Sequence, residues 1–189
     1  MAGDGGRMNE TIRFAVGETS LGAALVACTD AGIVSLAFGD DRAALVAELR
    51  QRFPMSQPIE DGAGIARIAA HALRFVEAPW SGDLDLPLDL QGTGFQLQVW
   101  QALRAIPPGR TASYTDIARS IGRPAAARAV ARACGANPVA VLVPCHRIVR
   151  RDGSRSGYRW GAERKRRLLE REAAAVAGPA YCRPSIGLP

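Results

Sequence analysis

The run Pro144-Cys145-His146-Arg147 is the place in this sequence where residue types and spacing most clearly allow reactive chemistry. The thiolate is the reactive form of cysteine, and nearby cations lower the pKa of a thiol. One histidine and three arginines follow Cys145 within six residues. Pro144 favours an extended residue before it, so Cys145 is expected to emerge at a defined angle. The pattern predicts a nucleophilic cysteine.

A carboxylate that can orient the His146 ring lies further along the chain. Residues 161–175 predict a helix on which Glu172 follows Leu168 and Leu169 by four and three residues, which places Glu172 on the apolar face. A buried carboxylate needs a partner, because burying it alone is costly. Neutral His146 is a suitable partner. Lys165, two turns earlier on the same face, is the alternative, and that pair would be purely structural.

The less reactive interpretation of Cys145 is a buried structural cysteine beside a core histidine, which is the commoner situation for an isolated pair. The basic flank and the available carboxylate favour the catalytic interpretation. The remaining cysteines are widely scattered, with no Cys-x-x-Cys pair, and the chain has only two histidines. We therefore predict no disulfide framework and no metal site.

The elements that must position these residues form a mostly helical C-terminal half. An amphipathic helix over 95–106 ends at Pro107-Pro108-Gly109. Short helices over 114–121 and 125–134 flank a Gly-containing turn, and the second carries arginines, which is typical of a helix-turn-helix. Residues 139–143 are a continuous apolar run that predicts a buried extended segment leading to Cys145.

The N-terminal half predicts a small antiparallel sheet followed by helices. Apolar runs over 11–16, 21–29 and 32–38 are separated by turn residues, as in a three-stranded meander. Amphipathic helices follow over 42–53 and 65–77, each ending before a proline, and residues 81–92 link the halves. We predict an α+β fold with an N-terminal subdomain over 10–91, a C-terminal subdomain over 92–175, and flexible tails at 1–9 and 176–189.

Composition and charge narrow the classes of protein. The 189 residues are 48% hydrophobic and 22% charged, which excludes a disordered chain, and no apolar run is long enough to span a membrane. Residues 1–91 carry 7 Arg and 13 acidic residues, a net −6, whereas residues 92–189 carry 17 basic and 5 acidic residues, a net +12. A basic half indicates a polyanionic partner, with nucleic acid as the first candidate. The start has no apolar core of the signal-peptide kind, so we expect a cytoplasmic protein.

The run Val143-Pro144-Cys145-His146-Arg147-Ile148 resembles the Ile-Pro-Cys-His-Arg-Val signature of the O6-alkylguanine-DNA alkyltransferases. Residues 92–173 resemble this family closely, and Ser156-Gly157-Tyr158-Arg159-Trp160-Gly161 is most similar to its bacterial adaptive-response members. Residues 10–91 resemble it only in layout. The resemblance implies a ribonuclease H-like N-terminal subdomain and a winged-helix-like C-terminal one.

The reaction that the resemblance implies is direct, irreversible transfer of an alkyl group from O6 of guanine in DNA to Cys145. The resemblance implies no cofactor that could regenerate the thiol, so each protein molecule would be used once. Lesser activity on O4-methylthymine stays open. By resemblance, His146 takes the thiol proton through a water molecule while Glu172 orients the ring. Asn137 is implied as the hinge between the second short helix and the active-site segment, and Tyr114 as a hydroxyl donor to the base. Helix capping and turn formation are the alternatives for Tyr114 and Asn137.

The same resemblance implies a set of residues that bind DNA and the flipped base. Arg128 would fill the base stack after the damaged nucleotide rotates out, and small Ala129 would allow close approach to the minor groove. Tyr158 and the backbone of Arg159 would belong to the loop over the base, where the Arg159 side chain would narrow the pocket. The simplest alternative for Arg128 is a solvated cation.

The expected partner is double-stranded DNA that contains O6-alkylguanine, bound by a monomer. Two other classes remain open. A DNA-binding regulator whose Cys145 is a sensor or is inert would accept no methyl group, and a cysteine hydrolase would turn over many times.

Overall fold

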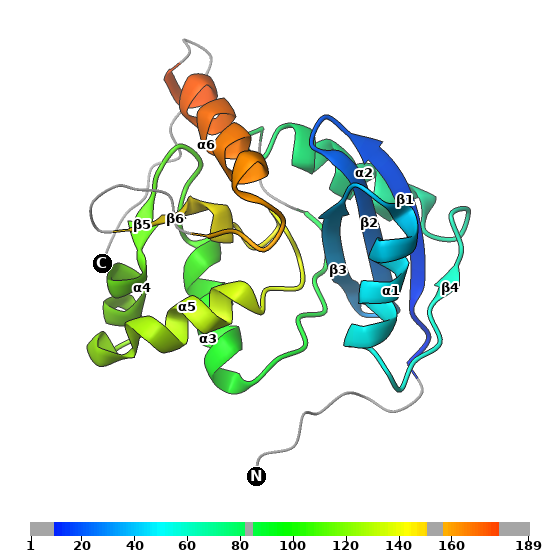
Figure 1. The fold of residues 1–189 in the computed structure, drawn as a ribbon, viewed down its shortest axis with the longest axis horizontal. Coiled ribbons are helices and arrows are strands. Elements are labelled where there is room, and N and C mark those ends of the chain that lie inside the picture. Colours follow the sequence, from blue (N-terminus) through cyan, green and yellow to red (C-terminus); the bar gives the residue numbers. More distant parts are fainter. Residues whose placement is uncertain (1–9, 82–84, 151–156, 178–189) are drawn as a thin grey trace.

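The structure is a computed structural model that describes residues 10–81, 85–150 and 157–177. Figure 1 shows a sheet with two helices on one side of the molecule and a mostly helical part on the other. The α+β class predicted from the sequence is confirmed. No helix among the described residues is long and apolar enough to cross a membrane.

The sheet is built on the predicted meander. Strands β1 (Arg13–Thr19), β2 (Gly22–Thr29) and β3 (Gly32–Gly39) are antiparallel neighbours. Gly22 and Gly32 have φ of 102° and 145° at the two tight turns, where a side chain would be strained. A fourth strand, β4 (Ile59–Glu60), pairs in parallel with β1 and gives the order β3-β2-β1-β4. This strand was not predicted, because two exposed residues carry no alternation signal.

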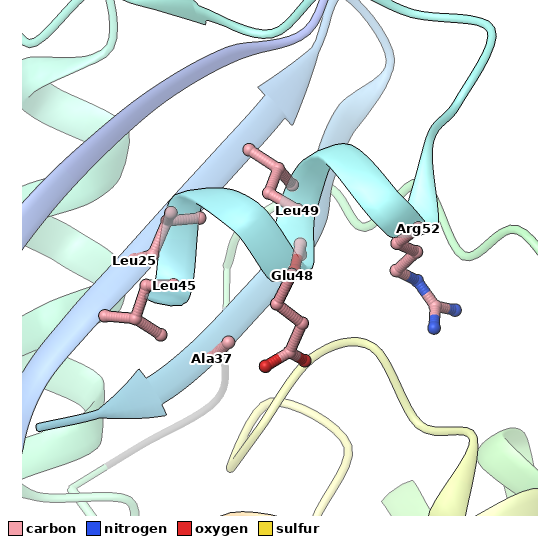
Figure 2. Close-up of a pocket in the computed structure, with 7 residues that line it drawn as sticks. Leu25, Ala37, Leu45, Glu48, Leu49 and Arg52 are labelled. Carbon is pink, nitrogen blue, oxygen red and sulfur yellow. The ribbon is translucent and has the colours of Figure 1, made fainter. Parts of the chain in front are cut away.

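Two helices cover the sheet. Helix α1 (Arg42–Arg52) is capped by the Asp41 carboxylate, which accepts the backbone N–H groups of residues 43 and 44, and it packs on β2 and β3. Helix α2 (Ala66–Glu77) packs on β1 and β2. A small cavity lies between α1 and the sheet, with Leu25, Leu45 and Leu49 on its walls and Glu48 at its edge (Figure 2).

The helix-turn-helix predicted from the sequence is formed by α4 and α5. Helix α3 (Gly94–Arg104) packs against both α4 (Tyr114–Ser120) and α5 (Ala127–Gly135). The turn contains Gly122 at φ 71° and the 3-10 helix η1 (Pro124–Ala126), so α5 begins two residues later than expected. Capping boxes at Thr93 and Ser113 satisfy the first amides of α3 and α4.

The segment before Cys145 differs from the prediction of an extended strand. Val139 alone bridges to Leu36 of β3, and residues 140–142 form a turn with Val141 at φ 65°. Residues 139–148 are nevertheless all buried. The apolar run therefore predicted burial correctly and backbone conformation incorrectly, since an apolar run does not distinguish a strand from a buried turn.

The chain then forms the 3-10 helix η2 (Cys145–Arg147), strand β6 (Ile148–Val149) and helix α6 (Ala162–Ala177). Strand β6 pairs in parallel with β5 (Ala112–Ser113), which places the segment after Cys145 beside the start of α4. Helix α6 includes residues 176 and 177, which were predicted to belong to the tail. The Val176 side chain packs over Gly109, which explains the extra residues.

The helical part is bonded directly to the sheet. The Arg164 side chain at the start of α6 donates to the Leu21 carbonyl at 2.7 Å, pairs with Asp40 at 2.5 Å and donates to the Trp160 carbonyl at 3.0 Å. On the other side, the Leu36 N–H donates to the Pro138 carbonyl at 3.0 Å. These contacts fix the segment around residue 160 and the segment before Cys145 against the same sheet.

Candidate active site

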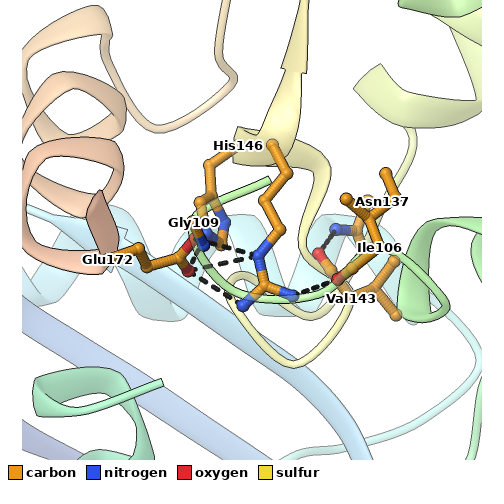
Figure 3. A network of polar contacts seen from close by, with 7 residues as sticks. Ile106, Gly109, Asn137, Val143, His146 and Glu172 are labelled. Atoms are coloured by element: carbon orange, nitrogen blue, oxygen red, sulfur yellow. Dashed lines mark hydrogen bonds and ion pairs between the residues drawn. The ribbon is translucent and has the colours of Figure 1, made fainter. Parts of the chain in front are cut away.

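Cys145 begins η2 and lies against the end of α5. Its side chain is 6% exposed. The Asn137 amide donates to the Sγ of Cys145 at 3.2 Å and to the Val143 carbonyl at 2.8 Å, and its oxygen accepts the Val139 N–H at 3.0 Å. Figure 3 shows the bond between Asn137 and Val143. One amide thus bridges the helix-turn-helix, the buried turn and the thiol.

The electrostatic state of the thiol is the opposite of what the basic flank predicts. Burial raises the pKa of Cys145 to about 11 and outweighs the hydrogen bond from Asn137 and the nearby charges of Lys165 and Arg159. The expectation of a lowered thiol pKa was wrong because the sequence shows the cations but not the burial. A protonated thiol in the DNA-free protein requires a base to take its proton.

His146 and Glu172 form the contact that the sequence predicts. The His146 Nε2 lies 2.8 Å from a Glu172 carboxylate oxygen, and both side chains are fully buried (Figure 3). Burial lowers the pKa of His146, and its hydrogen bond and charge interaction with Glu172 oppose that shift. The other ring nitrogen, Nδ1, is buried and has no hydrogen-bond partner among the described residues. With Nε2 donating to the carboxylate, a neutral ring keeps its lone pair on Nδ1.

Arg147 has a role that the sequence did not reveal. Its side chain is 6% exposed and bonds to the Glu172 carboxylate through Nε at 3.0 Å and Nη2 at 2.9 Å. The Gly109 N–H adds a bond to the same carboxylate at 3.2 Å. The expectation that Arg147 would act on Cys145 followed from its place two residues further along the chain, but its side chain reaches Glu172 on α6 instead. Its guanidinium and the His146 ring hold the pKa of Glu172 down at about 2, against the effect of burial.

Lys165 is the second buried cation of the site. Its side chain is fully buried in α6, and its ammonium donates to the Ile148 carbonyl. Burial lowers its pKa to about 8, while interactions with Cys145 and Cys134 oppose the shift. The sequence placed Lys165 on the buried face correctly, as a rival partner for Glu172. Its charge interaction with the thiol could not be foreseen, because η2 and α6 are brought together only by the fold.

The segment before α6 brings aromatic rings to the site. The Tyr158 ring lies edge-on to His146 with centroids 6.5 Å apart, and edge-on to Trp160 at 5.2 Å. Burial raises the pKa of Tyr158 well above its ordinary value, so its hydroxyl stays protonated. The Arg159 side chain instead pairs with Glu48 of helix α1 at 2.5 Å. The sequence contained no signal for this pairing.

Three of the residues predicted to bind DNA or the flipped base lie on the helix-turn-helix, whereas Tyr158 and Arg159 lie in the segment before α6. Tyr114 is the first residue of α4 and is half-buried, directly after the β5–β6 pairing that joins α4 to the active-site segment. Arg128 is exposed near the start of α5, with half-buried Ala129 next to it. The predicted site residues therefore form two groups, one around the thiol and one on an exposed helical surface. Within the described ranges, no cluster of three or more His, Cys, Asp or Glu side chains is suited to a metal ion.

Fold and site together define an α+β protein in which a helix-turn-helix adjoins a buried cysteine with a histidine–glutamate pair. Residues 94–174 match the family described as 6-O-methylguanine DNA methyltransferase, DNA binding domain. The chain is 47% identical over 170 residues to the bifunctional transcriptional activator/DNA repair enzyme Ada of Escherichia coli, covering 89% of this chain and 47% of that protein. It therefore spans about half the length of that relative.

Two further comparisons cover most of the related protein. The chain is 46% identical over 126 residues to the inducible methylated-DNA–protein-cysteine methyltransferase of Bacillus subtilis, covering 67% of this chain and 70% of that one. Its fold matches the crystal structure of Mycobacterium tuberculosis OGT in complex with DNA, with a TM-score of 0.69 and 36% identity over 87% of this chain and 93% of that chain. The chain belongs to the methylated-DNA–protein-cysteine methyltransferase family.

Proposed function

We propose that this protein repairs DNA by moving an alkyl group from O6 of guanine to the Sγ of Cys145, once per molecule. The observation that carries the proposal is a buried thiol, bonded to Asn137 and followed by a Glu172-bound histidine, next to a helix-turn-helix. Family membership supports the reaction, and a related protein whose structure includes DNA supports the substrate class.

The step balances without a cofactor. The S–C bond forms as the C–O6 bond breaks, and the electron pair of the broken bond passes into the purine ring. The proton lost by the thiol is taken up by His146, through a water molecule, and an equivalent proton reaches the base, so guanine leaves neutral. Glu172 stabilises the protonated ring that forms briefly. The thioether has no route back to a thiol, which makes the protein a single-use reagent.

The remaining roles follow the position of each side chain. Tyr114 at the start of α4 donates its hydroxyl to the flipped base, and Arg128 on exposed α5 occupies the gap in the duplex, with Ala129 allowing close approach. Tyr158 and the Arg159 backbone close over the base. Asn137 orients the thiol through the bond at 3.2 Å.

We further infer the organisation in which this chemistry takes place. Residues 10–91 form a ribonuclease H-like subdomain and residues 92–175 a winged-helix-like one, a division that the separate sheet and the β5–β6 pair beside the helix-turn-helix support. The protein acts as a monomer in the cytoplasm, on double-stranded DNA that contains O6-alkylguanine.

Intact mass tests the reaction. After incubation with a duplex that contains O6-methylguanine, the protein should gain one CH2 unit, with the methyl group mapped to the peptide that contains Cys145. Cys145→Ser should gain nothing while still binding DNA, and Cys28→Ser is the matched control that should react normally. An unmodified wild-type protein would favour a regulator, and repeated turnover would favour a hydrolase.

A further inference from the structure

The guanidinium of Arg147 is bound at both ends by groups that lie far from it in the sequence. At one end it donates hydrogen bonds to the Glu172 carboxylate. Nε lies 3.0 and 3.2 Å from the two oxygens, and Nη2 lies 2.9 Å from one of them. At the other end Nη1 donates to the Ile106 carbonyl at 2.5 Å (Figure 3). Arg147 therefore fixes α6 against the end of α3 from a position two residues after Cys145.

The Glu172 carboxylate is fully occupied as a result. One oxygen accepts from Arg147 and from His146, and the other accepts from Arg147 and from the Gly109 N–H. Gly109 has φ of 70°, and a side chain there would meet Val176 of α6 at 2.9 Å. The turn after α3 thus approaches α6 closely enough for its backbone to bind the carboxylate.

A carboxylate shared in this way affects His146 in two opposing directions. Beside a histidine, a free carboxylate favours the protonated ring. A guanidinium on the same carboxylate compensates its charge and opposes that effect. The other groups that act on or face the ring are Lys165 of α6, a cation, and Tyr158, whose raised pKa keeps its hydroxyl protonated and neutral. Unlike Lys165 and Tyr158, Arg147 is a cation that bonds directly to Glu172, the hydrogen-bond partner of the ring.

We propose that Arg147 is a positioning residue that holds Glu172 in one place and keeps His146 neutral, with the proton on Nε2 and the acceptor on Nδ1. This inference rests on the proposed function, because only a neutral ring can take the proton of Cys145. Without Arg147, Glu172 would hold His146 in the protonated form at the pH where the thiol must be deprotonated. A purely structural Arg147 would fix α6 equally well but would leave the protonation of His146 unchanged.

The test is the titration of His146 by NMR in the DNA-free protein. The chain contains only His71 and His146, so His71→Gln leaves a single histidine signal. In this background, wild-type His146 should be neutral at pH 6.5 and carry its proton on Nε2. Arg147→Gln should raise the midpoint of protonation by about one pH unit, roughly a 10-fold change in proton affinity. The pH below which the methyl-transfer rate falls should rise by the same amount.

Two controls separate charge compensation from general effects. Arg166→Gln removes a cation from α6, the helix that carries Glu172. Because Arg166 pairs with Glu163 and Glu170, the His146 midpoint should stay unchanged. Arg147→Lys keeps the charge without the planar two-nitrogen contact. Its His146 midpoint should lie between those of the wild type and Arg147→Gln. If Arg147→Gln does not fold, Arg147→Lys is compared with wild type instead.

The outcomes distinguish this proposal from the proposed function. A protonated His146 at pH 6.5 in the wild type, or an unchanged midpoint in the folded Arg147 variants, would overturn the role of Arg147. Because the titration needs no DNA and no methyl transfer, it can succeed where the repair reaction fails. Conversely, the wild type could transfer the methyl group while the Arg147 variants keep the wild-type midpoint of His146 protonation. That result would support the repair function and contradict this role for Arg147.

Discussion

Cys145 is the residue on which the proposed chemistry depends, and its environment favours the thiol over the thiolate until a base acts on it. Burial raises its pKa to about 11, whereas Lys165 and the Asn137 amide act in the other direction. Burial lowers the pKa of His146, and its ring bonds to the Glu172 carboxylate, whose pKa is held down at about 2 by His146 and Arg147. We propose that His146 takes the proton of the thiol and that the Glu172 carboxylate then stabilises the protonated ring.

The histidine–glutamate contact predicts a change in pH dependence when Glu172 loses its charge. Glu172→Gln removes the anion that stabilises protonated His146, so the ring becomes a weaker base. We expect the transfer rate near pH 7 to fall roughly 10- to 100-fold, in the range of general-base effects. The rate should recover in part as the pH approaches the thiol's own pKa. A folded variant with the wild-type pH profile would reduce Glu172 to a packing residue.

Lys165 predicts a second electrostatic effect on the same thiol. Its ammonium favours the thiolate of Cys145, and this benefit exists only while the lysine is protonated, below about pH 8. Lys165→Met should therefore slow transfer at pH 7 by about 10-fold and raise the thiol pKa, which thiol-reactive probes measure as a function of pH. The neighbouring Arg166→Met is the control and should react at the wild-type rate on free O6-alkylguanine.

At the scale of elements, the helices with strong periodicity were predicted well and the short irregular pieces were not. The three strands and α1 to α6 lie close to their predicted bounds, because caps, prolines and apolar spacing define them locally. Strand β4 and the turn over 140–142 depend on partners elsewhere in the chain. The same holds at the site: Glu172 was found from its place on a helix face, whereas the contacts of Arg147 and Arg159 required the tertiary structure.

Helix α5 predicts a difference between duplex and free-base substrates. Arg128 is exposed near the start of this helix and is proposed to occupy the gap left by the flipped nucleotide. Arg128→Ala should slow repair of duplex DNA by roughly 10-fold or more, since unstacking a base costs a few kcal/mol. Reaction with free O6-alkylguanine should change little. Arg132→Ala, also exposed on α5, is the matched control, and equal losses on both substrates would leave Arg128 a general cation.

At the scale of the whole molecule, charge and architecture divide along the same line. Residues 1–91, which contain the sheet, carry a net −6, and residues 92–189, which contain the helix-turn-helix, carry a net +12. Bonds such as those of Arg164 to Leu21 and Asp40 hold the two parts together. The acidic part thus supports the active-site segment, while the basic part carries the helix-turn-helix that we propose binds DNA.

This distribution predicts a strong dependence of DNA affinity on salt. Basic side chains that contact phosphates release counterions, so the affinity should fall about 10-fold or more between roughly 50 and 200 mM salt. Fluorescence anisotropy with an undamaged duplex measures the slope on a log–log plot. The Cys145→Ser variant should give the same slope, because the substitution changes no basic side chain. A salt-independent affinity would remove the basic half as the DNA-binding surface.

The stoichiometry of methyl transfer tests the single use of Cys145 most directly. A fixed amount of protein is mixed with increasing amounts of a duplex that carries labelled O6-methylguanine, and the label on the protein is counted after prolonged incubation. We expect a plateau at one methyl group per protein molecule, all of it on Cys145, with no further loss of lesions from the DNA. More than one lesion repaired per protein molecule, or label on any other residue, would contradict direct and irreversible transfer to this cysteine.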